Sequence, residues 1–532
     1  ARTAILDWFK QEDLLGNVRD YEHSVGHSYR SHAPIEPYLS DQWYVRVTDD
    51  RLGGEALRAM APDQHAGDPP PRPDGTTHPQ DGQLRFTPER YAKTFQSWHD
   101  QLRDWCISRQ LWWGHRIPVW SRTFTVSEAG SLPNADGFLR PEEGVTLPFA
   151  DAPRNGCSTM IRIDRPNDAV TVFVCVDANR PERETELAEA GFHQDEDVLD
   201  TWFSSALWPM STMGWPDPDA FDDLEGLLET FNPSSVLCTA REIITLWVSR
   251  MVMFNRYFRD GTLPFRDVAI HPMIQDGHGQ KMSKSLGNGV DPRDIIRTHS
   301  ADALRFVMAS IATSTQDVRL PLDLVCPHTG ETFTPEFITS PSGHVVTAPT
   351  QTCPSDSSKT MVTVYGVLSG EAEPSTEQPM AVNSSSKFDL GRNLATKLWN
   401  ASRFALAKVE SPATDLDPDA LGLVDRWMLA RMAATIELID TSLERFQVHL
   451  YADAIYDLVW RDFCDWYLEC IKPTVSDCPQ QQRVLLTVLD GILRLMHPLC
   501  PFVTETLWPH VQAAGEAGGP MLELPRSELL AA

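Results

Sequence analysis

The sequence predicts an α/β protein with a parallel sheet, followed by an all-α helical bundle. Between residues 196 and 312, apolar strand-like runs alternate with helical segments, as where SSVLCT precedes REIITLWVSRMVMFNRYF. This order is typical of a parallel sheet. Beyond Phe388, apolar residues instead recur three and four positions apart, which predicts packed helices. They are Leu429, Met432, Ile436, Ile439, Leu443 and Phe446, then Val484, Val488, Ile492 and Leu495.

Length and composition limit the class of protein. A chain of 532 residues is too long for one core and should form several domains. Its 42% apolar and 23% charged residues are typical of a soluble globular protein. Because it has no apolar run of about eighteen residues, we expect no membrane span, and we expect a cytoplasmic protein. Its 10 scattered cysteines indicate reduced thiols rather than a disulfide framework.

The net charge of −28 lowers the expectation of a nucleic-acid partner, because phosphate contacts need lysine and arginine. It does not exclude a local basic face. An acidic, solvated surface is the simpler interpretation of this charge.

The N-terminal third contains one predicted linker and one clear predicted helix. Residues 61 to 82 are crowded with proline, glycine and acid, which indicates a loop. Directly afterwards, Thr87 and Pro88 resemble an N-cap and first helical position. The residues that then recur at helical spacing predict one buried helix face. They are Tyr91, Phe95, Trp98 and Leu102.

Two segments interrupt this plan as predicted insertions. Residues 121 to 195 mix short strand-like runs such as VTVFVCV with turns, which indicates a small β-rich insertion. Residues 320 to 387 start in the same way and end in SGEAEPSTEQPMAVNSSS, a composition that predicts a flexible linker.

The strongest candidate for chemistry is the stretch GHGQKMSKSLGN, Gly277 to Asn288, which we call the lysine loop. It should leave the sheet at the carboxyl edge, where ligands bind in parallel sheets. Lys281 and Lys284 stand on flexible stems that can follow the charge of a phosphate chain during a reaction. Asp291 and Pro292 then predict a capped helix that anchors the loop. The alternative interpretation is a solvated basic turn.

Within this loop, KMSKS resembles the second signature of the class I aminoacyl-tRNA synthetases, and the similarity extends over DGHGQKMSKSLGNGVDPRDIIRTHSADALRF. In that family the lysines bind the ATP phosphates and stabilise the departing pyrophosphate. The resemblance implies that Lys281 and Lys284 are catalytic. It also implies an ATP-binding set that contains Lys281, Met282, Ser283, Lys284, Ser285, Ala240 and Glu242. Relatives commonly carry glycine at the position of Ala240 and aspartate at that of Glu242. The resemblance therefore supports the adenosine contacts less strongly than the phosphate contacts.

Two further stretches resemble the valyl-tRNA synthetases within class I. They are DVLDTWFSSALWPMSTMGWP, residues 197 to 216, and RDWCISRQLWWGHRIPVW, residues 103 to 120. The resemblance implies that Trp202 and Trp247 form aromatic walls of an amino-acid pocket that also contains Asp200. A rigid indole wall can exclude one extra methylene, which is worth only about 1–3 kcal/mol.

The sequence departs from this family in its metal sites. HSVGH, His23 to His27, differs from the family's first signature and resembles the base of a zinc knuckle. Ser28 and Ser31 stand where relatives place cysteines, and serine hydroxyls do not replace thiolates on Zn²⁺. The later Cys326, His328 and Cys353 resemble a degenerate zinc ribbon. We therefore expect no structural zinc.

The resemblance covers nearly the whole chain and implies six segments. It implies a remnant that follows the editing domain at 1–83, with a degenerate zinc knuckle and a proline-rich linker, and a return into the catalytic domain at 84–120. The β-rich insertion would occupy 121–195 and the C-terminal half of a Rossmann-type catalytic domain 196–319. A second insertion with a zinc-ribbon-like part and a flexible linker would occupy 320–387, and a helical anticodon-binding domain 388–532.

We therefore expect a valine–tRNA ligase of protein synthesis, with valine, ATP with Mg²⁺, and tRNA(Val) as partners, acting as a monomer. The first-signature half and the editing domain are expected to be missing, so the chain is expected to be a fragment and inactive by itself. Two alternatives stay open. One is a non-catalytic tRNA-binding paralogue, and the other is a related isoleucyl- or leucyl-type ligase.

Overall fold

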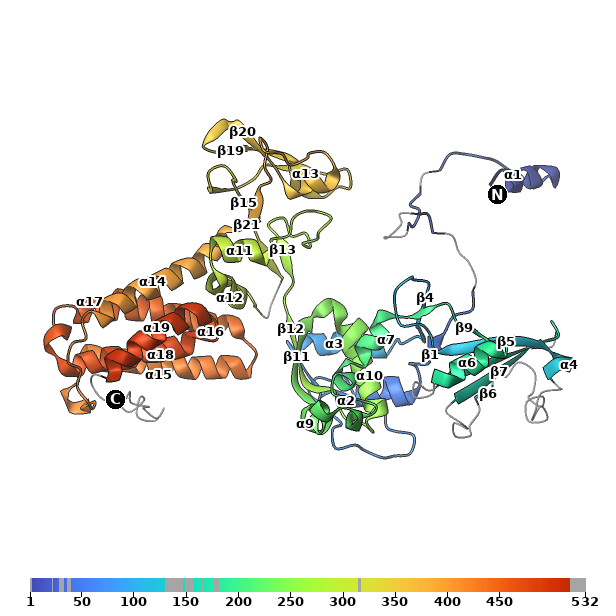
Figure 1. Ribbon diagram of the computed structural model, residues 1–532, viewed down its shortest axis with the longest axis horizontal. Helices are drawn as coiled ribbons and strands as arrows, with labels where there is room; N and C mark the ends of the chain where they lie inside the picture. The colour runs from blue at the N-terminus through green and yellow to red at the C-terminus, as the bar shows by residue number, and fades with distance from the viewer. Residues whose placement is uncertain are drawn as a thin grey trace. The chain divides into compact units, whose positions relative to one another are not determined.

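The computed structural model describes residues 2–21, 23–27, 33–35, 40–129, 147–148, 157–164, 166–176, 181–313 and 317–516 (Figure 1). The chain divides into two compact units. Unit 1 contains Ala1–Arg46 and Asp104–Asp200, and unit 2 contains Val47–Arg103 and Thr201–Ala532. Among the residues described, no helix is both long enough and apolar enough to cross a membrane.

Unit 1 is built around a five-stranded antiparallel sheet in the order β6-β7-β8-β5-β9. Its strands are β5 (Val119–Thr125), β6 (Leu147–Pro148), β7 (Cys157–Asp164), β8 (Ala169–Val176) and β9 (His193–Gln194). Alternate residues of β8 are buried and pack with Phe124, which is the period expected of a strand with one core face. Helices α4 (Val126–Ala129) and α6 (Pro181–Glu189) follow β5 and β8 in the chain.

The rest of unit 1 consists of short elements. Helix α1 spans Arg2–Gln11. Strand β1 (Tyr44–Val45) pairs with β3 (Trp105–Cys106), and β4 (Ser108–Arg109) pairs with β10 (Val198–Leu199). Residues 105–109 therefore pair with β1 through β3 and with β10 through β4.

The predicted parallel sheet is confirmed in unit 2. Strands β11 (Ser234–Ala240), β12 (Phe265–His271) and β2 (Arg85–Thr87) lie in the order β11-β12-β2, and both pairings are parallel. Unit 2 also contains α2 (Glu55–Ala59), α3 (Arg90–His99), α7 (Thr201–Ala206), α8 (Trp208–Ser211), α9 (Leu227–Phe231) and α10 (Ser249–Phe258). Most of helix α10 is buried, and it contacts α2, α7 and α8, so it forms the centre of this region, while Tyr257 and Phe258 at its end are exposed.

The predicted helix after β2 exists, but its buried face differs from the prediction. Helix α3 begins at Arg90, two residues after Pro88, and it ends at His99. It buries Ala92, Phe95, Gln96 and His99, whereas Trp98 is 41% exposed. The ring of Phe95 lies 5.0 Å from that of Phe86 on β2, and this contact fixes which face meets the sheet.

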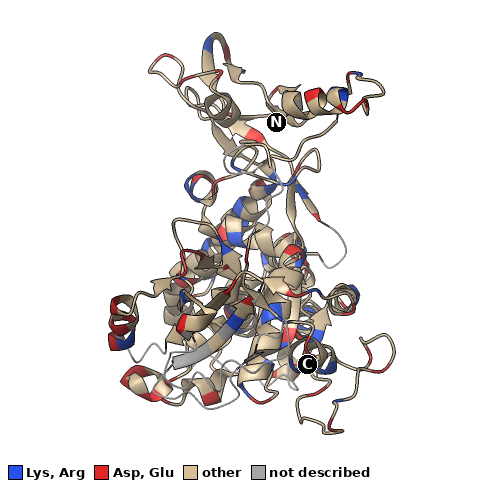
Figure 2. Cartoon of the chain, turned by 90° about the vertical axis from the view of Figure 1, so that its right-hand side faces the viewer, with Lys and Arg blue, Asp and Glu red and all other residues tan. Residues whose placement is uncertain are grey.

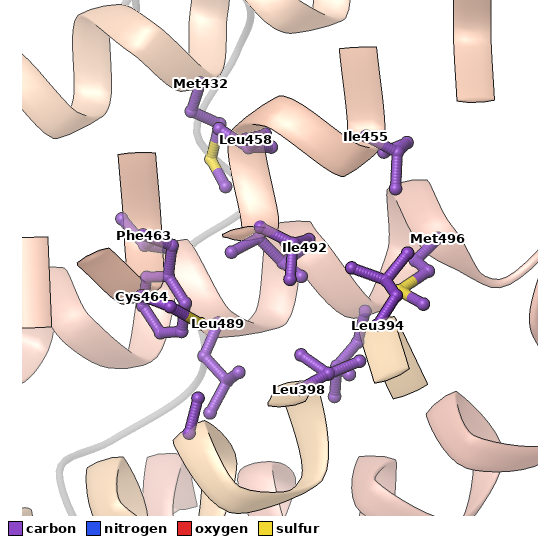
Figure 3. Close-up of a cluster of buried hydrophobic side chains, with 14 of the residues drawn as sticks. Leu394, Leu398, Met432, Ile455, Leu458, Phe463, Cys464, Leu489, Ile492 and Met496 are labelled. Atoms are coloured by element: carbon purple, nitrogen blue, oxygen red, sulfur yellow. The ribbon is translucent and has the colours of Figure 1, made fainter. Parts of the chain in front are cut away.

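The C-terminal helices share one apolar core (Figure 3). They are α11 (Pro292–Thr298), α12 (Ala301–Ser310), α14 (Asp389–Leu406), α15 (Leu423–Glu444), α16 (Val448–Tyr456), α17 (Leu468–Ile471), α18 (Pro479–Met496) and α19 (Pro501–Glu516). A π-helical segment, Asp457–Tyr467, joins α16 to α17. Leu394, Met432, Phe463 and Ile492 come from four different elements and meet in this core (Figure 3). The predicted helical bundle is therefore confirmed.

Residues 320 to 387 contain one three-stranded antiparallel sheet, two antiparallel pairs of strands and one α-helix. The elements are β15 (Asp323–Val325), β16 (Thr332–Phe333), β17 (Phe337–Thr339), β18 (Val345–Thr347), β19 (Thr350–Cys353), β20 (Asp356–Val362), α13 (Val364–Ser369) and β21 (Val382–Ser384). Strand β21 pairs with β15. Ala381 and Asn383 are buried, so part of the segment expected to be a flexible linker is an ordered strand.

Candidate active site at the lysine loop

The carboxyl ends of the parallel strands lie at one edge of the sheet. Ala240, the last residue of β11, is in register with His271 at the end of β12. The chain then turns through a short 3₁₀ segment, Arg241–Ile243, that carries Glu242. In parallel sheets this edge is where ligands bind, because free backbone N–H groups and helix starts converge there.

The lysine loop follows β13 (Ile274–Asp276), which pairs with β14 (Val318–Leu320). The carboxylate of Asp276 organises its first half. It accepts hydrogen bonds from the backbone N–H groups of His278 (3.0 Å) and Gln280 (2.9 Å) and from the Gln280 side chain (2.9 Å). Burial alone would raise the pKa of Asp276, but the hydrogen bonds from Asn288, Gln280 and His278 lower it. This carboxylate is therefore held ionised as the base of the loop.

Asn288 organises the other half. Its Nδ2 donates to Asp276 Oδ2 at 2.8 Å, and its Oδ1 accepts from the backbone N–H of Ser283 at 2.9 Å. Asp276 and Asn288 are both buried, and they join the two ends of the loop to each other. Sequence reasoning missed these two residues, although both are polar residues that flank the glycine- and serine-rich stretch.

Lys281 and Glu242, two members of the predicted ATP-binding set, form an ion pair. Lys281 Nζ lies 2.9 Å from each carboxylate oxygen of Glu242, and the two side chains are 63% and 48% exposed. An exposed ion pair of this kind contributes at most about 1 kcal/mol. A phosphate group could therefore replace Glu242 as the partner of Lys281 at small cost.

The side chain of Lys284 is exposed and forms no ion pair or hydrogen bond with any residue that the structure describes. Of its neighbours in the signature, Ser285 is exposed, and Met282 and Ser283 are half-buried. The hydroxyls of Ser283 and Ser285 lie 3.1 Å apart, and Met282 packs against the core of the helical bundle. The central part of the loop thus combines an apolar contact through Met282 with two cationic side chains that are exposed to solvent.

A second set of contacts joins the loop's strand to the end of β11. Asp317 accepts two hydrogen bonds from the guanidinium of Arg241, at 3.0 and 2.7 Å. It also accepts from Met273 N and from Gln275 Nε2, each at 3.2 Å. Because Arg241 is adjacent to Glu242, Asp317 helps to hold Glu242 near the loop.

The expected amino-acid pocket residues are distributed over both units. Trp202 lies on α7, and Trp247 lies in the π-helical segment Ile244–Val248 that contacts α7. Trp247 Nε1 donates to the backbone oxygen of Ser205 at 3.0 Å, which fixes its ring. Asp200 belongs to unit 1, where its buried carboxylate accepts from Arg109 at 2.7 Å and from Trp105 Nε1 at 3.1 Å. The pocket roles of these three residues stay predictions.

Of the candidate metal residues, Cys326 and Cys353 lie together in the part of the chain that is described, and His328 has a different partner. No group of three or more His, Cys, Asp or Glu side chains there could hold a metal ion. His23 and His27 are exposed, while Ser28 and Ser31 lie outside the described residues. Sγ of Cys326 and Sγ of Cys353 lie 3.3 Å apart in the core of the second insertion, and His328 Nε2 lies instead 3.0 Å from the backbone oxygen of Thr360.

Comparisons with known proteins identify the family of the chain. The family model for "tRNA synthetases class I (I, L, M and V)" matches residues 16–131 and 171–321. The model for "Anticodon-binding domain of tRNA ligase" matches residues 425–525. A methionyl-tRNA synthetase structure from Mycobacterium tuberculosis shares the fold, with a TM-score of 0.50, 13% identity, and coverage of 91% of this chain and 65% of that chain.

Several curated relatives are similar along almost the whole chain. The valine–tRNA ligase of Rhodopirellula baltica is 38% identical over 528 residues, which is 98% of this chain and 46% of the relative. That of Thermotoga maritima is 34% identical over 519 residues, 97% of this chain and 44% of the relative. The chain thus spans somewhat less than half the length of these relatives. With the parallel sheet, the lysine loop and the helical bundle, these matches show that the chain belongs to the class I tRNA synthetases of the isoleucine, leucine, methionine and valine group.

Proposed function

We propose that the protein containing this chain is a valine–tRNA ligase, which joins valine to ATP, releases pyrophosphate and transfers the valyl group to tRNA(Val). One observation carries the proposal. Two exposed lysines stand at the carboxyl edge of a parallel sheet, on a loop whose ends are joined by buried Asp276 and Asn288. The names of the relatives that match along the whole chain support valine as the amino acid.

In this proposal the lysine loop acts on the phosphates of ATP. Lys281 leaves Glu242 and Lys284 leaves solvent when both bind the phosphate chain, and both stabilise the negative charge that grows on departing pyrophosphate. The rate gain comes from positioning and charge stabilisation, with no side chain as a covalent nucleophile. Mg²⁺ would accompany ATP and neutralise its phosphates. Because the described residues form no metal-ligand cluster, we assign its main ligands to the phosphates themselves.

The walls of the valine pocket are assigned to Trp202 and Trp247. The hydrogen bond from Trp247 to the backbone of α7 supports a rigid wall, since it fixes the ring relative to the helix that carries Trp202. Ala240, the last residue of β11, and Glu242, in the 3₁₀ segment that follows it, would face the adenosine part of the adenylate. Asp200 is the third residue that we assign to the amino-acid pocket, and its carboxylate pairs with Arg109.

The helical bundle is assigned to tRNA binding. Its matched residues, 425–525, support this assignment. Along much of the chain, the positions of lysine and arginine are interspersed with those of aspartate and glutamate (Figure 2). Because phosphate contacts need lysine and arginine, we expect them to come from local groups of basic residues. The affinity for tRNA should then depend steeply on salt concentration.

The experiment is amino-acid-dependent exchange of pyrophosphate into ATP, measured on the native polypeptide that contains this chain. Valine should support exchange much better than isoleucine, leucine or methionine at equal concentration. If isoleucine, leucine or methionine supported exchange better than valine, that amino acid would be the substrate instead of valine. Exchange with none of the four, together with intact tRNA binding, would favour a non-catalytic tRNA-binding protein instead.

A further inference from the structure

Residues 322–424 lie outside both family models, and they include the second insertion, β15 to β21. This insertion touches the lysine loop, which is the signature segment of the family. The contacts lie at the two ends of the loop.

The first end is held through Gln280. Its Nε2 donates to the backbone oxygen of Val345 at 2.7 Å, and its Oε1 accepts from the backbone N–H of Val345 at 2.9 Å. The side-chain amide thus pairs with Val345 as a neighbouring strand would. Next to it, the ring of His278 makes an edge contact with Phe337 of β17, with 4.6 Å between the ring centroids.

The second end is held through Asn383 of β21. Its Nδ2 donates to the backbone oxygen of Gly287 at 2.9 Å and to that of Gly289 at 2.7 Å. Asn383 is only 5% exposed, so both hydrogen bonds are shielded from water. Gly287 also packs closely against the insertion, because a Cβ added there would lie 2.8 Å from the backbone nitrogen of Tyr365.

The middle of the loop differs from its ends. Among the described residues, no hydrogen bond or ion pair joins residues 281–286 to the insertion. Both lysines belong to this middle part. Fixing the two ends of a short loop removes many of its conformations and leaves its centre free to move over a small range.

We propose that the second insertion is a positioning module for the lysine loop, in which Asn383 and Gln280 are positioning residues that set where Lys281 and Lys284 stand. The catalytic part of this inference rests on the proposed function. Its structural part, that the insertion restrains the loop, does not.

The structural part is tested by tryptic cleavage after Lys281 and Lys284 in the native polypeptide. Asn383→Ala removes the donor to the backbone oxygens of Gly287 and Gly289, so we expect cleavage after Lys281 and Lys284 to become about tenfold faster, with no change at sites outside the loop. Gln378→Ala is the matched control, because Gln378 lies in the same insertion but donates to Thr360 Oγ1 instead of to the loop. If Asn383→Ala does not fold, Asn383→Ser keeps a small polar side chain and should show a smaller increase. Cleavage equal to wild type in a folded Asn383 variant overturns the inference.

The catalytic part is tested by a double-mutant comparison in the pyrophosphate exchange assay. Asn383→Ala should lower kcat about tenfold with little change in the KM for ATP, because positioned lysines act mainly in the transition state. In a Lys284→Ala background the same substitution should have a much smaller effect, since the group it positions is gone. Equal fold-losses in both backgrounds would show that Asn383 acts only on overall structure. An inactive wild type would refute the proposed function alone, and the proteolysis result would still decide the restraint.

Discussion

Gly287→Ala should push the lysine loop away from the insertion. Gly287 has φ of +62°, a left-handed conformation that costs an alanine about 1 kcal/mol. The added Cβ would also lie 2.8 Å from Tyr365 N and 3.0 Å from Tyr365 Cα, atoms of a backbone that cannot rotate away. Overpacking of this kind typically costs about 1–3 kcal/mol. We therefore expect the free energy of unfolding to fall by about 2–4 kcal/mol if the loop stays in place, or by less if the loop moves.

Two other glycines separate these effects. Gly370 has φ of +73° and an added Cβ would meet no atom within 4 Å, so Gly370→Ala should cost only the backbone term of about 1 kcal/mol. Gly289 is in open space without a left-handed φ, so Gly289→Ala should be nearly neutral. Urea unfolding and pyrophosphate exchange should be measured for all three variants. If Gly287→Ala matched Gly289→Ala in both assays, the close contact between loop and insertion would be refuted.

Two further predictions concern the parts that support the site. Burial lowers the pKa of His99 to about 4, even though its ring contacts Phe95 O and Ser249 Oγ. Between about pH 6.5 and pH 4, His99 is therefore protonated in the unfolded chain and neutral in the folded chain. Protonation favours unfolding in this range, so unit 2 should lose about 2 kcal/mol of stability when the pH falls from 7 to 5. Urea titrations should show that His99→Asn removes most of this pH dependence, and an unchanged slope would contradict the assignment. The Asp302 carboxylate on α12 accepts hydrogen bonds from Phe502 N (3.1 Å) and Val503 N (2.7 Å) at the start of α19. Asp302→Ala should therefore destabilise the bundle by about 1–2 kcal/mol. A variant that is as heat-stable as wild type would show that this cap contributes nothing.

The sequence predicted well where the signal is local. The alternation of strand-like and helical runs predicted the parallel order of β11 and β12. Asp291 and Pro292 predicted the start of α11, and the Asp291 carboxylate does accept from Arg293 N. These features depend on neighbouring residues, which share one short stretch of chain.

The sequence predicted less where distant residues decide. The face of α3 depends on Phe86, and Trp98 is left exposed although its spacing matches the predicted stripe. AVNSSS has the composition of a linker, yet β21 is buried because it pairs with β15 and because Asn383 reaches Gly287 in the lysine loop. No local pattern indicates a contact between residues that lie almost a hundred positions apart in the chain.

The central claim is that Lys281 and Lys284 form a catalytic phosphate clamp rather than a tRNA-binding patch. It is tested most directly by measuring valine-dependent pyrophosphate exchange and tRNA(Val) affinity for Lys284→Ala in the native polypeptide. The account predicts that exchange falls by at least about a hundredfold while the Kd for tRNA changes by less than about threefold, because the charge is needed mainly in the transition state. Similar losses in exchange and in tRNA affinity would contradict it.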